Sequence, residues 1–127
     1  MKNIYLLVIL ELLVACTSKK NDPVPVKKVT ITYDFNASEI GSFQIGYVDS
    51  ANMAANTQFK GTHWVKTITI TGTKHCQKVL LAVTAINKDY VGLADARIIV
   101  NSKLNADYTY SFNKGHSNFE FYGDPWQ

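Results

Sequence analysis

The sequence predicts an all-β protein built as a single antiparallel β-sandwich of about seven to eight strands. From Val29 onward, apolar and polar residues alternate in short runs, which is the period of a half-buried strand. These runs are rich in Val, Ile, Thr, Tyr and Phe, the residue types that strands favour. Each run closes at Gly, Asn, Asp or Ser, which are common turn residues.

The first half of this region predicts four strands. They are Val29–Asn36, Phe43–Tyr47, Met53–Lys60 and Trp64–Thr71. The segment from Ser38 to Gly41 interrupts the first two, and Gly61 with Thr62 separates the last two. Trp64–Thr71 has the clearest alternation, with isoleucines on one face and threonines on the other.

The second half predicts the remaining strands, Val79–Ile86, Ala94–Asn101, Tyr108–Phe112 and Phe119–Phe121. Val79–Ile86 is almost continuously apolar, so periodicity alone also fits a short helix. Its length and its Val and Ile content favour a central strand that is buried on both faces. The last two strands are expected to pair as a hairpin across Asn113–His116.

Residues 1–15 predict a secretory signal peptide, because a basic start precedes an apolar run of about a dozen residues. The run is too short for a membrane-spanning helix, which needs roughly 20 apolar residues. It ends in Leu13-Val14-Ala15-Cys16, which resembles the lipobox of bacterial lipoproteins. The resemblance implies that Cys16 is lipidated and becomes the first residue of the mature chain. Glu11 departs from the pattern, since a charge weakens the apolar core of a signal.

Residues 16–28 are expected to form a flexible basic tether, and residues 29–127 the folded domain. The net charge of +3 arises in the tether, which has four lysines against Asp22, while the domain is neutral. Basic residues beside an anionic bilayer are favourable, although a solvated spacer explains them equally well. A neutral domain without a basic stripe excludes nucleic acid as an expected partner.

The sequence predicts no catalytic residues, no metal site and no cofactor. His75 and Cys76 are adjacent, so they point to opposite faces of an extended chain, whereas zinc needs converging ligands. Asp34 and Glu120 are candidates for a pair of catalytic carboxylates, but a solvated surface explains them as well. If the lipid occupies Cys16, Cys76 is a lone thiol, more plausibly buried than reactive. Without lipidation, a Cys16–Cys76 disulfide is the alternative.

The candidate binding residues are Tyr90, Val91 and Leu93, in the loop between the predicted strands Val79–Ile86 and Ala94–Asn101. Sizeable apolar side chains occupy positions where polar turn residues are usual, and such loops often carry recognition. Two interpretations remain open: a compact binding tip, or Val91 and Leu93 folding back to plug the core. Trp64, Trp126 and several tyrosines also offer rings for stacking on a glycan, although filling the rim of the core explains them too.

Four segments together resemble strands of a known family, the small Bacteroidetes-type lipoproteins with an immunoglobulin-like β-sandwich. These segments are Val29–Tyr33, Phe43–Asp49, Trp64–Ile70 and Ala96–Asn101. The chain is also distantly similar to the small accessory membrane proteins of mycobacterial lipid transporters. The resemblance covers most of Val29 to Tyr122 and implies an immunoglobulin-like sandwich, and it transfers no catalytic residues.

We therefore expect a lipid-anchored cell-envelope lipoprotein that acts as a non-catalytic binding or accessory module. The expected partners are the membrane, through the N-terminal lipid, and an envelope protein. Thr17 stands where inner-membrane lipoproteins often carry Asp, which favours the outer membrane. Two alternatives are an inhibitor or immunity protein against a hydrolase, and an envelope enzyme.

Overall fold

The structure is a computed structural model that describes residues 26–72 and 78–126. Its secondary structure consists of six strands. They are β1 (Lys27–Val48), β2 (Ala54–Gly72), β3 (Val79–Ala85), β4 (Gly92–Val100), β5 (Lys103–Phe112) and β6 (Asn118–Gly123). The first strand thus begins two residues before Val29. In the described ranges, no helix is long and apolar enough to span a membrane.

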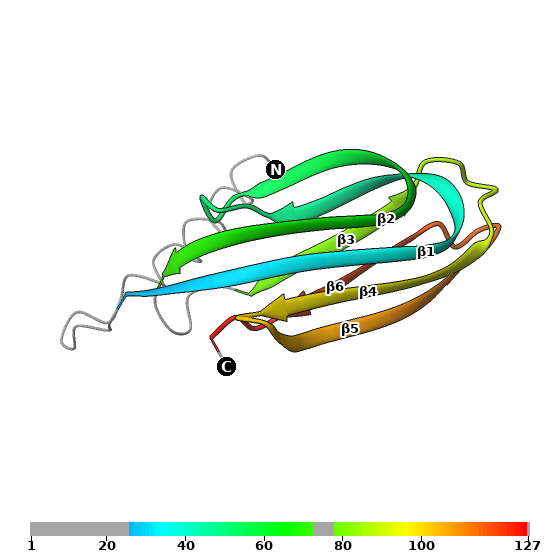
Figure 1. Cartoon of the computed structure of the whole chain (residues 1–127). Coiled ribbons are helices and arrows are strands. Elements are labelled where there is room, and N and C mark those ends of the chain that lie inside the picture. The colour runs from blue at the N-terminus through cyan, green and yellow to red at the C-terminus, as the bar shows by residue number, and fades with distance from the viewer. Residues whose placement is uncertain (1–25, 73–77, 127) are drawn as a thin grey trace, which may run out of the picture.

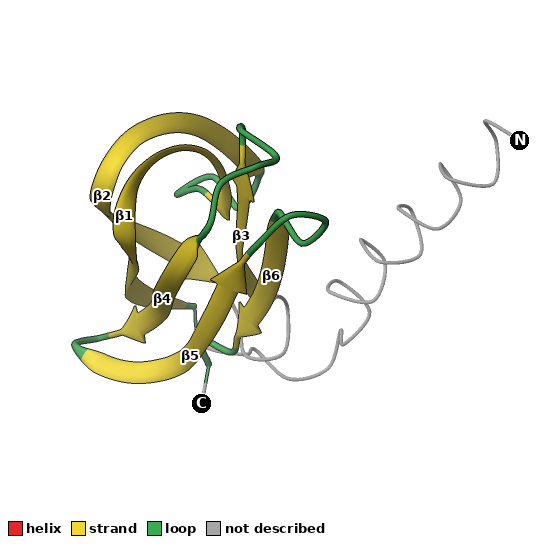
Figure 2. Cartoon of the chain, turned by 90° about the vertical axis from the view of Figure 1, so that its right-hand side faces the viewer, coloured by secondary structure: helices red, strands yellow, loops and turns green. Residues whose placement is uncertain are grey.

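All strands belong to one antiparallel sheet in the order β5-β4-β1-β3-β6, with β2 paired to the other edge of β1. The first half of β1 pairs with β4 and its second half with β3, while β2 follows β1 along both halves. Because β1 and β2 bend together, the sheet curls around its own inner face and becomes partly barrel-like (Figure 1 and Figure 2). The prediction of an all-β antiparallel fold is confirmed.

The bend explains why the structure has six strands where the sequence predicted seven or eight. Gly41 of β1 lies directly opposite Gly61 of β2, so neither chain carries a side chain at the corner. Gly61 has a φ of 146°, a conformation that other residues rarely adopt. Beside this pair, Ala37–Ile40 of β1 stand opposite Thr62 alone, which makes a large β-bulge. Glycines that were interpreted as strand ends therefore bend two continuous strands.

The core consists of the inward residues of the alternating runs, as the sequence predicted. In β1 these are Val29, Ile31, Tyr33, Phe35, Phe43 and Ile45, all buried. Phe43 lies at the centre of an aromatic cluster and contacts the rings of Phe35, Phe59, Tyr90 and Phe112. In the central strand β3, only one face is fully buried, since Leu80 and Ala82 are half-buried and Thr84 is exposed. The expectation of burial on both faces was thus wrong, although β3 does lie between β1 and β6.

The predicted pairing of the last two strands is also wrong. Only one bridge, between Asn113 and His116, joins them, and β5 then pairs with β4 while β6 pairs with β3. Aromatic rings cover the seam between β5 and β6, with Tyr108 and Tyr110 packed against Phe119. These aromatic rings lie between β5 and β6, where the two strands form no hydrogen-bonded ladder.

At the end of this seam that lies away from the β5–β6 turn, the side chain of Asn105 joins β5 to the residue that follows β6. The register of β4 and β5 shifts between Ile98 and Ile99, which leaves Asn105 unpaired with β4. The Asn105 amide donates to the carbonyl of Asp124 and accepts from the Asp124 backbone N–H, both at 2.7 Å. This reciprocal pair imitates a bridge between two strands, so the bulge holds the chain end against the sheet.

Alkaline solution is expected to destabilise the fold through Tyr33. Burial raises the pKa of its hydroxyl, which donates to the carbonyl of Val48 at 2.9 Å. The folded state keeps this proton where the unfolded chain has released it, so the stabilisation is complete below about pH 10 and is lost as pH rises. In Tyr33→Phe, the urea midpoint should fall less steeply above about pH 10 than in the unchanged chain. Tyr122→Phe, which changes an exposed tyrosine, is the control and should follow the unchanged chain. If the urea midpoint of Tyr33→Phe fell as steeply as that of the unchanged chain, the role given to Tyr33 would be wrong.

Candidate functional site

The candidate site is one end of the molecule, where the bulge of β1 meets the loop between β3 and β4 and the first two residues of β4. Two hydrogen bonds join these segments. The Tyr90 hydroxyl donates to the carbonyl of Glu39 at 2.7 Å, and the Leu93 backbone N–H donates to Ser38 Oγ at 2.9 Å. The bulge places Ser38 and Glu39 outside the pairing with β2, which leaves them free to accept these bonds. We call residues 37–41 and 86–93 together the tip.

Tyr90 closes the end of the core. Its ring packs edge-on against Phe43 at 5.1 Å and against Phe112 at 5.4 Å between ring centroids. Burial raises the pKa of the Tyr90 hydroxyl, and the hydrogen bond to Glu39 opposes that effect. Gly41 makes room for the ring, because a Cβ there would lie 2.7 Å from an edge atom of Tyr90. Tyr90 is therefore the plug of this end.

The aliphatic side chains of the tip face solvent. Ile40, Val91 and Leu93 are 72%, 64% and 58% exposed, and Ile86 is about half exposed. The sequence offered two interpretations of this loop, and the structure divides them between residues. Tyr90, which the binding-tip interpretation left exposed, packs against the core, whereas Val91 and Leu93, which the other interpretation used as the plug, are exposed. Exposed aliphatic groups in one place commonly mark an interaction surface.

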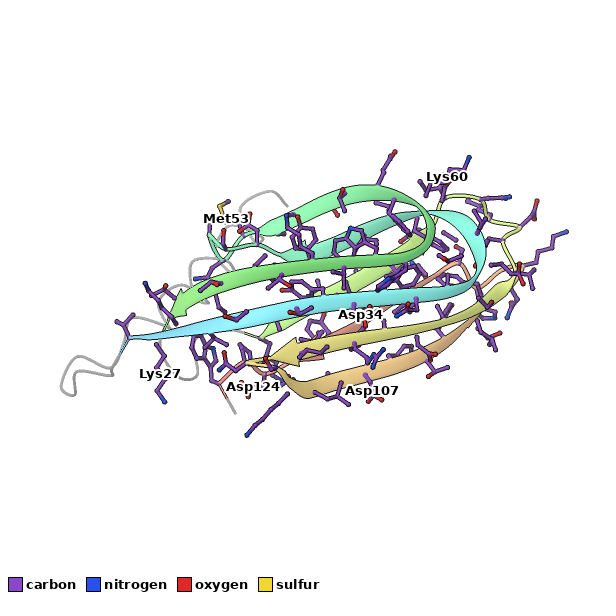
Figure 3. The ribbon with its side chains drawn as sticks, viewed as in Figure 1. Lys27, Asp34, Met53, Lys60, Asp107 and Asp124 are labelled. Atoms are coloured by element: carbon purple, nitrogen blue, oxygen red, sulfur yellow. The ribbon has the colours of Figure 1, made fainter. Side chains whose placement is uncertain are left out.

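The tip and the N-terminal end of the domain lie at opposite ends. Figure 1 shows β1 running from Lys27 to the bend at the other end, where the β3–β4 loop and the β5–β6 turn also lie. In Figure 3, Lys27 and Lys60 mark the two ends. With about 3.3 Å per strand residue, the stretch from Lys27 to Ala37 separates them by roughly 33 Å.

Apart from the tip, a cluster of polar side chains lies on the outer face of the sheet, where β1, β2 and β4 run side by side. Asp34 is only 9% exposed although it faces outward (Figure 3). Its Oδ1 lies 2.9 Å from His63 Nε2 and 3.1 Å from the Asn36 amide, and its Oδ2 lies 3.2 Å from Arg97 Nη2. Both carboxylate oxygens are thus engaged, and the cluster links three neighbouring strands.

This cluster differs from the carboxylate pair that the sequence suggested. Glu120 lies on β6 and accepts a long hydrogen bond from Tyr122 at 3.4 Å, while Asp34 binds His63 and Arg97 on the other strands. The structure therefore gives these two acids different partners. In residues 26–72 and 78–126, no three His, Cys, Asp or Glu side chains come together as a metal site.

The aromatic residues considered for glycan stacking are dispersed. Trp64 packs against Tyr47 at 5.6 Å, and Trp126 packs against the core near Gly72. Tyr33 is buried, while Tyr47 and Tyr110 are half-buried at the rim. Two tyrosines differ from these: Tyr108 covers the seam beside β6 and remains 43% exposed, and Tyr122 of β6 is 55% exposed. Most of these rings thus fill the core or its rim.

Three residues of interest lie outside the described part of the chain. They are Cys16, His75 and Cys76. The expected lipidation, the alternative disulfide and the weak metal motif all depend on these positions and stay predictions.

Sequence reasoning missed Ile40, His63 and Arg97. Ile40 stands beside Glu39 and Gly41 in what looks like a polar turn, and only the bulge shows that it is presented at the tip. His63 and Arg97 come together with Asp34 through strand register, which no local motif announces. No protein-family model matches this chain, and no curated protein has a significantly similar sequence.

Proposed function

We propose that this protein is a lipid-anchored lipoprotein of the bacterial cell envelope, in the outer membrane, that acts as a non-catalytic binding or accessory module through its tip. The observation that carries the proposal is that Ile40, Val91 and Leu93 are exposed at the tip. Tyr90 holds the tip in place, because its ring packs on Phe43 and its hydroxyl donates to the carbonyl of Glu39. Burial of such side chains against a partner is favourable by roughly 25 cal/mol per Å² of apolar surface.

The position of the tip supports this proposal. An anchor at Cys16 would attach through the tether to the end that carries Lys27, and the tip occupies the opposite end (Figure 3). A fully extended chain spans up to about 3.3–3.6 Å per residue, so the ten residues 16–25 would add at most roughly 35 Å of reach. The anchored protein would thus present its apolar surface well away from the lipid that holds it.

The immunoglobulin-like sandwich implied by the resemblance is part of the same proposal. It is supported by the bent β1–β2 hairpin, which contributes one limb beside β4 and the other beside β3. Two opposed groups of strands would then share this hairpin.

The proposed function predicts that the tip contacts a partner in the intact envelope. A photoreactive amino acid at position 91 should give a crosslinked product in living cells on illumination. The same amino acid at position 104 is the matched control, because Leu104 is 59% exposed against 64% for Val91 and lies near the start of β5, directly after the turn that follows β4. A product of equal yield at both positions, or at neither, would contradict a binding role for the tip.

Two further arms of this experiment separate the alternatives. Capture of a hydrolase in a stable 1:1 complex at position 91 would replace the accessory role with that of an inhibitor or immunity protein. In cell fractions, Cys16→Ser should move the chain from the membrane to the soluble fraction. If the variant sediments with membranes as before, lipid anchoring at Cys16 is wrong.

A further inference from the structure

We propose that the outer edge of β2 is a pairing surface for a second copy of this chain, and that Lys66 keeps this edge closed. In the described part of the chain β2 pairs with β1 alone, so the other edge of β2 is the border of the sheet (Figure 1). Such an edge carries unpaired backbone N–H and C=O groups, on which another extended chain can add. The composition of the edge and the direction of Lys66 carry the inference.

The longer open part of this edge is the second half of β2, residues 62–70. It begins after Gly61, where β2 bends. It ends before Thr71, because the side-chain amide of Asn52 donates to the carbonyl of Thr71 at 3.3 Å. A second copy of the chain would therefore have to pair between the bend and this hydrogen bond.

The open stretch has the composition of a strand that pairs readily. From Val65 to Thr71 every residue except Lys66 is β-branched, and β-branched residues favour strands. Residues 62–70 contain no proline, no acid and no other lysine or arginine. Segments with high β-propensity and low charge are prone to pair with copies of themselves. Without Lys66, the edge would favour self-association.

The side chain of Lys66 points to the inner face of the sheet. Residues directly opposite each other in an antiparallel pair point to the same face, and Lys66 stands opposite Tyr33, which is fully buried. Its neighbours on that face of β2 are Trp64, which packs against the core, and Ile68, which is buried. Lys66 is nevertheless exposed. It reaches water past the border of the sheet, where none of the described strands covers it.

A charge in this place opposes the addition of a strand. The ion pairs of residues 26–72 and 78–126 are both made by Asp34, so no described acid neutralises Lys66. A strand added beyond β2 would cover the side chain, and burial of a charge without a partner is strongly unfavourable. Proteins commonly keep edges unpaired with lysines and with charges that point inward. Lys66 combines both properties.

A second copy of the chain meets a further obstacle at Lys66. The antiparallel register that pairs all of residues 62–70 with the same residues of another copy is centred on position 66. It places the two Lys66 side chains directly opposite each other, and like charges in that arrangement are destabilising. Shifted registers separate the lysines but shorten the ladder. Lys66 thus stands at the position that opposes the longest pairing.

The test compares the full chain with its Lys66→Thr variant, in detergent with micelles in excess over protein. Threonine suits the edge because it also stands at positions 67, 69 and 71. By light scattering the unchanged chain should be monomeric. Lys66→Thr should dimerise with a dissociation constant about a hundredfold lower, because no charge is then buried. Amide hydrogen exchange should show new protection within residues 62–70 of the dimer. Lys66→Gln is a second variant should Lys66→Thr fold poorly.

Two control variants separate the charge from its position. Lys60→Thr removes the other lysine of β2, which stands opposite Ser42 on the far side of the bend, and should stay monomeric. Lys66→Glu keeps a charge at position 66 and should also stay monomeric, since like charges again meet. If Lys66→Thr and Lys66→Gln stay monomeric, or if either control dimerises as readily as Lys66→Thr, the inference is overturned. Protection that appears only outside residues 62–70, or an unchanged chain that already pairs along this edge, overturns it as well.

Discussion

Replacing Phe43 by alanine is expected to lower the free energy of unfolding by about 3–5 kcal/mol, the usual cost of deleting a buried aromatic ring. Phe43 is fully buried, and its ring centroid lies 4.9 Å from that of Phe35 and 5.8 Å from that of Phe112. It stands two residues after Gly41, so its ring supports both the bend and Tyr90. A small domain is typically stable by only about 5–15 kcal/mol, so this variant approaches the limit of folding.

Urea unfolding followed by tryptophan fluorescence measures this effect. Phe43→Leu keeps most of the buried volume and should cost less than about 1.5 kcal/mol if the neighbouring rings repack. Tyr122→Ala removes an exposed ring of similar size and should change stability by no more than about 0.5 kcal/mol. A loss for Phe43→Ala as small as that for Tyr122→Ala would mean that the aromatic cluster does not hold the bend.

The second large effect is expected at Tyr90. Tyr90→Ala should cost about 2–4 kcal/mol, since it removes the ring that packs on Phe43 and Phe112 and the hydrogen bond to Glu39. In contrast, Leu93→Ala should change the free energy of unfolding by no more than about 0.5 kcal/mol because its side chain faces solvent. The urea midpoints of both variants measure the difference.

Tyr90→Phe separates the two contributions of the tyrosine. It keeps the ring and removes only the hydroxyl, so a loss of about 1 kcal/mol is expected. If Tyr90→Ala retained full stability while Leu93→Ala lost several kcal/mol, the assignment of plug and exposed surface would have to be exchanged. The proposed tip would then lose its physical basis.

Much of the fold could be predicted because the strand period of two is written directly in the residues. In Val29–Phe35 every second side chain is apolar, and the structure buries all four of them, with Asp34 buried as well. The number of strands was overestimated for a reason that a single chain cannot reveal. Gly41 and Gly61 look like two separate turns until the register places them opposite each other, where together they allow one shared bend.

The candidate site could be predicted only in part. Tyr90, Val91 and Leu93 stood out because apolar residues are unusual in a loop, but the direction of each side chain depends on tertiary contacts. The sequence could not show that the Tyr90 hydroxyl reaches Glu39, which lies 51 residues earlier. The cluster of Asp34 with His63 has the same origin, since its partners are 29 residues apart in sequence and join only through the pairing of β1 and β2.

The course of β1 also has a mechanical consequence. Were the N-terminal end held by a membrane and the tip held by a partner, tension would run along β1 from Lys27 to the bulge. Over Ile31–Asn36 that strand has hydrogen-bonded neighbours on both edges, β2 on one side and β4 on the other. Ladder bonds in an antiparallel pair lie perpendicular to the strands, so this load shears many of them together instead of opening them one by one. The domain would therefore resist stretching between its two attachment points better than it resists peeling from its C-terminal strand.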